Sequence, residues 1–233
     1  MKTRFIFTMK TRFILLVALF AFVSTTTVSA ALISRMLGLK NTPNLQQTIP
    51  VEQTTQQVVQ PQQTKVWRVG DYYNENGKEG VVFEVSANGR HGKIVSVKES
   101  FQLQWSSDEN EQRRLIGADN ENDGSKNMAK VMQIPAWRDK YPAFAWCASL
   151  GEGWYLPAKK ELKTIYRVKN KLNNTLADEG EKIRGHWHWS STEDDHQDKK
   201  SGRFCAWYVL MRGGNSYCFD KSFNGYVRAV SAF

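Results

Sequence analysis

Two regions of alternating hydrophobic and polar residues flank a central region of helical periodicity in the chain after residue 65. The first alternating segment, Gly80–Val97, contains Asn88-Gly89, a pair that favours a two-residue hairpin turn. The resulting register pairs Phe83 with Ile94, Glu84 with Lys93 and Val85 with Gly92. It brings the opposite charges of Glu84 and Lys93 together. It also predicts one buried face of the hairpin, formed by Phe83, Val85 and Ile94.

Three helices are predicted in the central region. The first starts near Gly124, the second carries Pro142 in its first turn, and the third follows Leu156-Pro157. Their apolar stripes are Met128, Val131 and Met132; Phe144, Cys147 and Ala148; and Leu162, Ile165 and Tyr166. At helical spacing these side chains should face a common core.

Short strands return after residue 187. The strand-like segments are Trp189–Thr192, Phe204–Met211, Tyr217–Phe219 and Tyr226–Phe233. A tight turn at Gly213-Gly214 should join the second and third of them. The order of strands, helices and strands predicts an α+β domain rather than repeated βαβ units.

The first thirty residues have the composition of a secretory signal peptide. A basic start precedes the apolar run Phe13–Val23, which is too short to cross a bilayer, and the small residues Val28-Ser29-Ala30 supply a cleavage site. The peptide that begins at Met1 recurs from Met9, so either methionine can be the start. The first cysteine is Cys147, so we expect a secreted protein, in the periplasm or at the cell surface, without a lipid anchor.

Residues 31–65 are predicted to be a disordered linker rich in Gln, Thr and Pro. All eight Trp and all eight Tyr follow it, so residues 66–233 should form the folded domain. Four basic residues and no acid fall within residues 1–30, which therefore hold much of the net charge of +9. The domain keeps too little positive charge for a nucleic-acid partner, and no later segment is apolar enough to span a membrane.

The domain contains an ordered series of short motifs. They are Tyr141-Pro-Ala-Phe-Ala-Trp-Cys147, Gly153-Trp-Tyr-Leu-Pro-Ala158, Trp189-Ser-Ser-Thr-Glu193, Ala206-Trp207 and Tyr226-Val-Arg-Ala-Val230. This series resembles the Fibrobacter succinogenes major paralogous domain family, close to the C-terminal domain of collagen-like bacterial adhesins, in the form found in secreted proteins of gut Bacteroidota. The resemblance implies a C-type-lectin-like fold, with two to three helices packed on small twisted antiparallel sheets. The triplets with which calcium-dependent lectins bind sugars do not occur, so that form of recognition is not expected.

The three cysteines allow at most one disulfide. A turn at Gly213-Gly214 pairs Val209 with Cys218, which leaves Cys205 about 13 Å along the strand and argues against a Cys205–Cys218 bridge. A Cys147–Cys205 bridge and buried free thiols both remain open. A paired-cysteine enzyme site, as in formylglycine-generating enzymes of related fold, is not expected because these cysteines lie in apolar segments.

Other polar clusters favour structural roles. Asp119–Gly124 begins like a calcium loop but has Lys130 where the bidentate Glu belongs. His186 and His188 share a strand face beside an acidic loop and are interpreted as exposed imidazoles, so we expect no metal and no cofactor. Ser190 and Ser191 lack a nucleophile elbow and should be hydrogen-bonding residues. Glu193 and Arg228 are predicted to form an ion pair.

The C-terminal region from Arg203 to Asn224 is the candidate ligand surface. If Cys205, Trp207 and Val209 face the core, the remaining aromatic and polar side chains face outward. The predicted ligand-binding residues are Tyr208, Arg212, Asn215, Tyr217, Asp220, Phe223 and Asn224. Aromatic faces beside amides and a guanidinium suit sugars or protein partners. The sequence therefore predicts a non-enzymatic binding module for an extracellular glycan or protein, the alternative being a structural subunit of a surface appendage or assembly.

Overall fold

The computed structural model describes residues 65–233, which lie within one compact unit, Gln60–Phe233. The predicted signal peptide and all but the last residue of the predicted linker lie outside the described residues. The described chain is α+β, with two five-stranded sheets and five helices among residues 65–233. The predicted fold class is therefore correct at this level.

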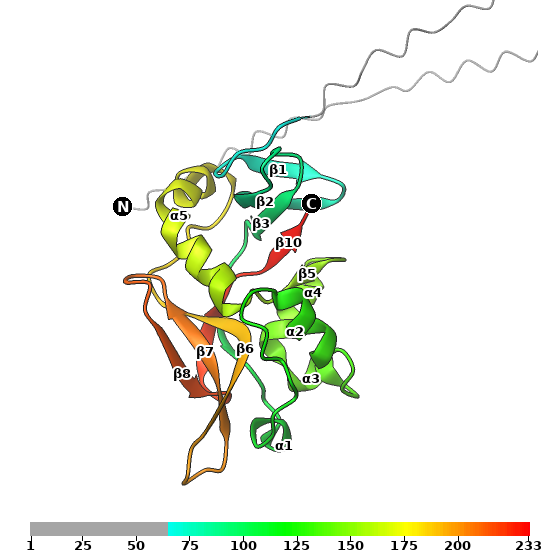
Figure 1. Cartoon of the computed structure of the whole chain (residues 1–233), viewed down its shortest axis with the longest axis vertical. Helices are drawn as coiled ribbons and strands as arrows, with labels where there is room; N and C mark the ends of the chain where they lie inside the picture. The colour runs from blue at the N-terminus through cyan, green and yellow to red at the C-terminus, as the bar shows by residue number, and fades with distance from the viewer. Residues whose placement is uncertain (1–64) are drawn as a thin grey trace, which may run out of the picture. The chain divides into compact units, whose positions relative to one another are not determined.

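The first sheet has the strand order β1-β2-β3-β10-β5. Its strands are β1 (Tyr72–Glu75), β2 (Lys78–Val85), β3 (Gly92–Ser96), β10 (Val230–Ala232) and β5 (Trp154–Tyr155). The second sheet has the order β4-β9-β6-β7-β8 and lies below the first in Figure 1. Its strands are β4 (Ser100–Gln104), β9 (Asn224–Val227), β6 (Trp187–Gln197), β7 (Phe204–Leu210) and β8 (Ser216–Asp220). All strand pairs are antiparallel except β6 with β9.

The helices are α1 (Glu109–Gln112), α2 (Gly124–Val131), α3 (Trp137–Lys140), α4 (Pro142–Ser149) and α5 (Lys159–Glu179). The long helix α5 packs against β2 of the first sheet and against β6 and β7 of the second. Helices α2, α3 and α4 gather on the other side of the view, next to β5 (Figure 1). The buried side chains of these helices and of both sheets form one hydrophobic cluster.

Most predicted helical stripes are buried. Phe144, Cys147, Leu162 and Ile165 are fully enclosed. Ala148 and Tyr166 are half-buried, and Met132 is exposed over 53% of its surface. Met132 is the C-cap of α2, and its side chain lines an open cavity at the edge of the first sheet instead of the closed core.

The predicted hairpin forms with part of its predicted register. Val85 lies opposite Gly92 and Glu84 opposite Lys93, but a β-bulge then pairs Ile94 with Val82 instead of Phe83. Phe83 is the extra residue of this bulge, and the consecutive residues Val81, Val82 and Phe83 are all in the core. Val85, predicted to be buried, is only half-buried.

The predicted strand Tyr226–Phe233 is divided in the structure. Its first part, β9, belongs to the second sheet, and its last part, β10, belongs to the first. The chain thus crosses between the sheets at Arg228 and Ala229. It makes an earlier crossing between β3 and β4, at Val97–Glu99.

Candidate functional site

The β7–β8 hairpin lies at one edge of the second sheet, with β8 as the edge strand, and carries most of the predicted ligand surface (Figure 1). Leu210 and Asn215 close its turn, with the Leu210 N–H donating to the Asn215 carbonyl at 2.8 Å. This turn is longer than the predicted one at Gly213-Gly214, so the register moves by two residues and Cys218 lies opposite Trp207.

The register shift brings Cys205 and Cys218 together as a disulfide, with their Cα atoms 5.6 Å apart. The prediction against a Cys205–Cys218 bridge is wrong, because it depended on the shorter turn. The bridge fastens the edge strand β8 to its neighbour β7. Cys147 is the free cysteine of the described chain; it is fully buried, and burial raises the pKa of its thiol well above the ordinary value.

Tyr208 does not belong to the ligand surface. Only 2% of it is exposed, and its ring stacks on that of Trp189 with centroids 3.6 Å apart. The predicted strict alternation along β7 fails because Cys205 and Ala206, and then Tyr208 and Val209, are buried as consecutive pairs. Gly225 allows this packing, since a Cβ there would lie 2.6 Å from the Tyr208 ring.

The other predicted ligand residues are accessible. Arg212, Asn215 and Asn224 are exposed, and Asp220 is half-buried. Tyr217 and Phe223 are large hydrophobic side chains with 45% and 55% of their surface exposed. Such exposure costs hydration free energy, and neighbouring exposed aromatic residues are typical of binding surfaces.

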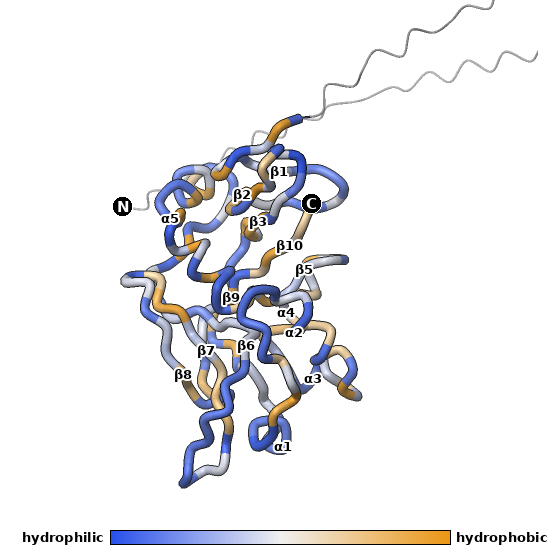
Figure 2. The backbone as a smooth tube through the Cα atoms, viewed as in Figure 1, coloured by the Kyte–Doolittle hydropathy of each residue, from blue (hydrophilic) through white to orange (hydrophobic). Residues whose placement is uncertain are grey.

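A cavity of about 390 Å³ opens next to this hairpin. Its lining includes the disulfide, Phe219, Phe223, Asp220 and Arg203, and also His196, Asp198 and Ser201 from the end of β6 and the turn that follows. Arg203 Nη1 lies 3.6 Å from Asp220 Oδ2, and Arg203 Nη2 lies 3.3 Å from Glu109 Oε1. Aromatic, cationic and anionic groups therefore converge on one small cavity. Figure 2 shows the neighbouring arm formed by the end of β6 and the start of β7 as mostly hydrophilic.

Within residues 65–233, the side chains close enough to share a metal ion are Asp194, Cys205 and Cys218. Both sulfurs belong to the disulfide and lack the thiolate charge that binds metals. Carboxylates of the Asp119–Gly124 segment instead bind neighbouring parts of the protein. Asp123 caps the N-terminus of α2, and Glu121 forms an ion pair with Lys159 at 2.6 Å.

A larger cavity of about 690 Å³ lies at the edge of the first sheet. Met128, Met132, Trp137, Trp154 and Tyr155 supply much of its apolar lining, with Lys78, Lys93 and Arg138 also contributing. The sequence does not reveal this cavity, because its walls come from segments that are far apart along the chain.

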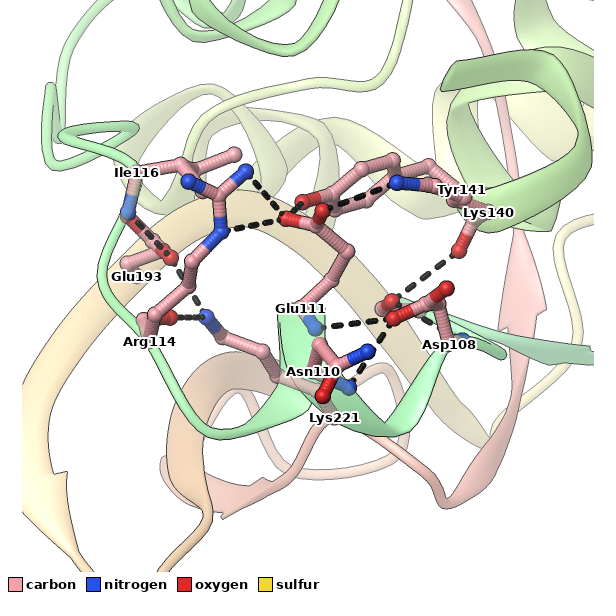
Figure 3. Close-up of polar contacts among 10 residues, drawn as sticks. Asp108, Asn110, Glu111, Arg114, Ile116, Lys140, Tyr141, Glu193 and Lys221 are labelled. Atoms are coloured by element: carbon pink, nitrogen blue, oxygen red, sulfur yellow. Dashed lines mark hydrogen bonds and ion pairs between the residues drawn. The ribbon is translucent and has the colours of Figure 1, made fainter. Parts of the chain in front are cut away.

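Buried charges support the loop that connects β4 to α2 (Figure 3). Glu193 Oε1 lies 2.5 Å from Lys221 Nζ, and Glu193 Oε2 accepts from the backbone N–H groups of Ile116 and Ala118. Lys221 is fully buried, and this burial lowers the pKa of its ammonium group despite the adjacent Glu193. The predicted Glu193–Arg228 ion pair is therefore wrong, because Lys221 takes the place expected for Arg228.

Glu111 accepts a second set of hydrogen bonds in the same cluster of buried charges. It accepts from the Tyr141 hydroxyl and from Arg114 Nε, each at 2.7 Å, and from Lys140 Nζ at 3.1 Å (Figure 3). Burial alone would raise the pKa of Glu111, but these hydrogen bonds lower it below the ordinary value. Shifted pKa values can mark catalytic groups, yet here the partners satisfy one another, so the cluster serves to hold the loop in place.

His188, interpreted as exposed, is fully buried. Its Nε2 lies 2.9 Å from Glu99 Oε2, and its Nδ1 lies 3.0 Å from the His186 carbonyl. His186 itself is exposed and stacks on Tyr226. The difference arises because Glu99, which lies far from His188 in the sequence, provides a buried partner. Ser190 and Ser191 form the predicted hydrogen bonds, with the Trp207 carbonyl and with Asn127.

The helices of residues 65–233 do not include one with the length and apolar character that a membrane span requires. The model of the Lcl C-terminal domain family matches residues 95–231, which is more than half of the chain. This match overlaps most of the segment that resembles the Fibrobacter succinogenes major paralogous domain. The Fibrobacter and collagen-like adhesin family names stay predictions. No curated protein matches the chain.

Among solved structures, the chain is similar to a fimbrial protein from Bacteroides ovatus. The TM-score is 0.52 at 15% identity, over 71% of this chain and 49% of the other. The chain thus spans about half of that protein, and at this identity the likeness concerns the fold.

Proposed function

The chain belongs to the Lcl C-terminal domain family, and on that basis we propose that it is an exported, non-enzymatic module that binds an extracellular glycan or protein. The observation that supports this function best is the pair of exposed aromatic side chains, Tyr217 and Phe223, at the free edge of the second sheet. Phe223 also lines the cavity that Arg203 and Asp220 share. Rigid aromatic groups beside charged ones provide contact area at a low entropic cost.

The Cys205–Cys218 disulfide strengthens the case for a binding surface. It joins the edge strand β8 to its neighbour β7 and lines the same cavity as Phe223, so the surface loses little conformational freedom when a ligand binds. An edge strand without such protection would invite unselective pairing with other chains.

We also propose a C-type-lectin-like fold for the domain. Two small sheets with a few helices agree with this fold. The two ends of the domain also lie close together, as this fold requires, because the ring centroids of Trp67 and Phe233 are 5.7 Å apart. The proposed location is the periplasm or the cell surface. Fractionation of producing cells combined with external protease treatment distinguishes the two compartments.

A glycan array and a protein pull-down test the binding function. The variants are Arg212→Ala, Tyr217→Ala and Phe223→Ala, each checked for an unchanged melting temperature. The matched control is Leu115→Ala, because Leu115 is 43% exposed and lies outside this surface. Loss of the signal in the three variants, but not in the control, supports the surface. Full binding by all three folded variants places the site elsewhere.

A structural role in a surface appendage is the second candidate, since the similar structure is that of a fimbrial protein. In this role the domain contributes a rigid unit to an assembly, and the free edge of the second sheet meets another copy of the chain. Sedimentation equilibrium of the purified chain tests it. A monomer at all concentrations contradicts this role.

A further inference from the structure

A small pocket lies where the chain passes from β3 to β4. Its volume is about 290 Å³, close to the lower end of the ~300–1,000 Å³ range of small-molecule sites. The lining residues are Glu99, Ser100, Phe101, Glu181, Arg184 and Tyr226. None of them belongs to the Arg203–Asn224 surface.

Glu99 places an unused hydrogen-bond acceptor at this pocket. Its side chain is only 2% exposed, and Oε2 has both His188 and Arg228 as partners. Oε1 is buried without any hydrogen-bond partner, and the nearest cation, Arg184 Nε, lies 3.8 Å away. Buried polar atoms are almost always paired, so an unpaired carboxylate oxygen on a residue that lines a pocket is suited to an O–H or N–H donor from a ligand once Arg184 moves aside.

The charges around the pocket balance one another. Glu99 and Glu181 contribute carboxylates to the lining and Arg184 contributes a guanidinium group, while the buried Arg228 contacts Glu99 Oε2 at 3.1 Å and the backbone carbonyl of Glu181 at 2.7 Å. A charged ligand would lose its hydration in this pocket without gaining an unpaired group of opposite charge. A neutral ligand with several hydroxyl groups meets no such penalty.

The pocket also offers a flat apolar surface. Phe101 is 55% exposed, and its ring centroid lies 6.2 Å from that of Tyr226. His186 stacks on Tyr226 at 4.8 Å and fixes the orientation of that ring. Arg184 is 55% exposed, so its side chain is free to move aside from Glu99 and to donate to a ligand. One apolar face with hydroxyl groups around its edge is the chemistry of a sugar ring.

We propose that this pocket binds one neutral sugar ring. A ring hydroxyl donates to Glu99 Oε1, a second oxygen accepts from Arg184, and the C–H face of the ring packs on Phe101. This site adds a neutral saccharide to the proposed binding role. It does not depend on the surface around Tyr217 and Phe223.

Saturation-transfer NMR on the purified chain tests this site with the methyl glycosides of glucose, galactose, mannose and N-acetylglucosamine. At least one should show transfer, and Phe101→Ala and Arg184→Ala should each weaken its binding by about tenfold. The matched controls are Leu115→Ala, an exposed apolar side chain outside both proposed sites, and Arg167→Ala, an exposed arginine of α5 outside the pocket. Both controls should bind within about twofold of the original chain. Phe223→Ala is measured alongside them to report on the Arg203–Asn224 surface.

Three results would each overturn the assignment. They are the absence of transfer for every neutral glycoside at millimolar concentration, binding that survives both pocket substitutions, and tighter binding of glucuronate or glucosamine than of neutral sugars. Resonance shifts of Phe101 and of the Arg184 Nε–H in the unmodified chain give a readout that does not require the variants to fold. A loss confined to the Phe223 variant would instead favour the Arg203–Asn224 surface, so the two proposals fail separately.

Discussion

Arg228 Nη2 lies 3.1 Å from Glu99 Oε2, and this ion pair joins the two places where the chain crosses between the sheets. Glu99 lies between β3 and β4, and Arg228 lies between β9 and β10. Arg228 also donates to the carbonyls of Ser96 and Glu181 at 2.8 and 2.7 Å. One buried guanidinium group thus holds both crossings and the segment that follows α5.

Loss of this guanidinium group should be costly. Arg228→Met leaves the Glu99 carboxylate buried without its cation, so we expect the free energy of unfolding to fall by about 3–5 kcal/mol. Urea unfolding followed by tryptophan fluorescence measures it. Arg184→Met is the matched control: Arg184 is 55% exposed and 3.8 Å from the same carboxylate, so its loss should cost at most about 1 kcal/mol. Equal effects of the two substitutions would contradict the assigned role of Arg228.

Stability should decrease in acid because of Glu99 and Glu111. Burial alone would raise both pKa values, but the partners outweigh it and lower them below the ordinary value of 4.5. The unfolded chain therefore binds protons at a higher pH than the folded chain. The stabilisation should be complete above the unfolded value and should disappear as the pH falls through the folded values.

Urea unfolding from pH 7 to pH 3 measures this dependence. Glu111→Gln should show a smaller loss of stability in acid than the original chain, since this carboxyl no longer titrates. Glu109→Gln changes a side chain that is 71% exposed and should alter the stability at pH 7 by no more than about 0.5 kcal/mol. An unchanged acid profile for Glu111→Gln would show that Glu111 does not contribute.

The Cys205–Cys218 disulfide should stabilise the domain by about 3 kcal/mol, because it closes a loop with a sequence separation of 13. Replacing both cysteines by serine should lower the melting temperature, and a reductant should lower that of the original chain to the same level. Mass spectrometry of the unreduced protein should detect the cross-linked peptide. A cross-linked peptide that contains Cys147 would contradict this pairing.

Gly225→Ala should destabilise the second sheet by about 1–3 kcal/mol, since the new Cβ would overlap the rings of Tyr208 and Trp189. Gly213→Ala is the control, because the nearest atom outside its chain neighbours, Asn215 Nδ2, lies 3.8 Å from the added Cβ. Thermal unfolding of both variants compares the costs. A similar melting temperature for the two would contradict the tight packing of Tyr208 on Trp189.

Local patterns predicted the elements more reliably than their partners. Helical spacing placed Leu162 and Ile165 in the core, and cross-strand charges placed Glu84 opposite Lys93. The same patterns did not reveal that Glu193 pairs with Lys221, because sequence spacing carries no information about which cation reaches a buried carboxylate. The exposure of Tyr217 and Phe223 could be predicted from the sequence. The burial of Tyr208 could not, because it depends on contacts with Trp189 and Gly225, which belong to other strands.

The amino-acid sequence by itself determined the α+β order, the apolar faces of the helices and the position of the turn before β8, since these depend on residues close together in the chain. Tertiary structure decided the length of that turn, and with it the register that joins Cys205 to Cys218. It also decided the division of the last strand between two sheets and the meeting of Glu99 with Arg228 and His188. These features depend on packing between distant segments, where the burial of one group fixes which partner another group can reach.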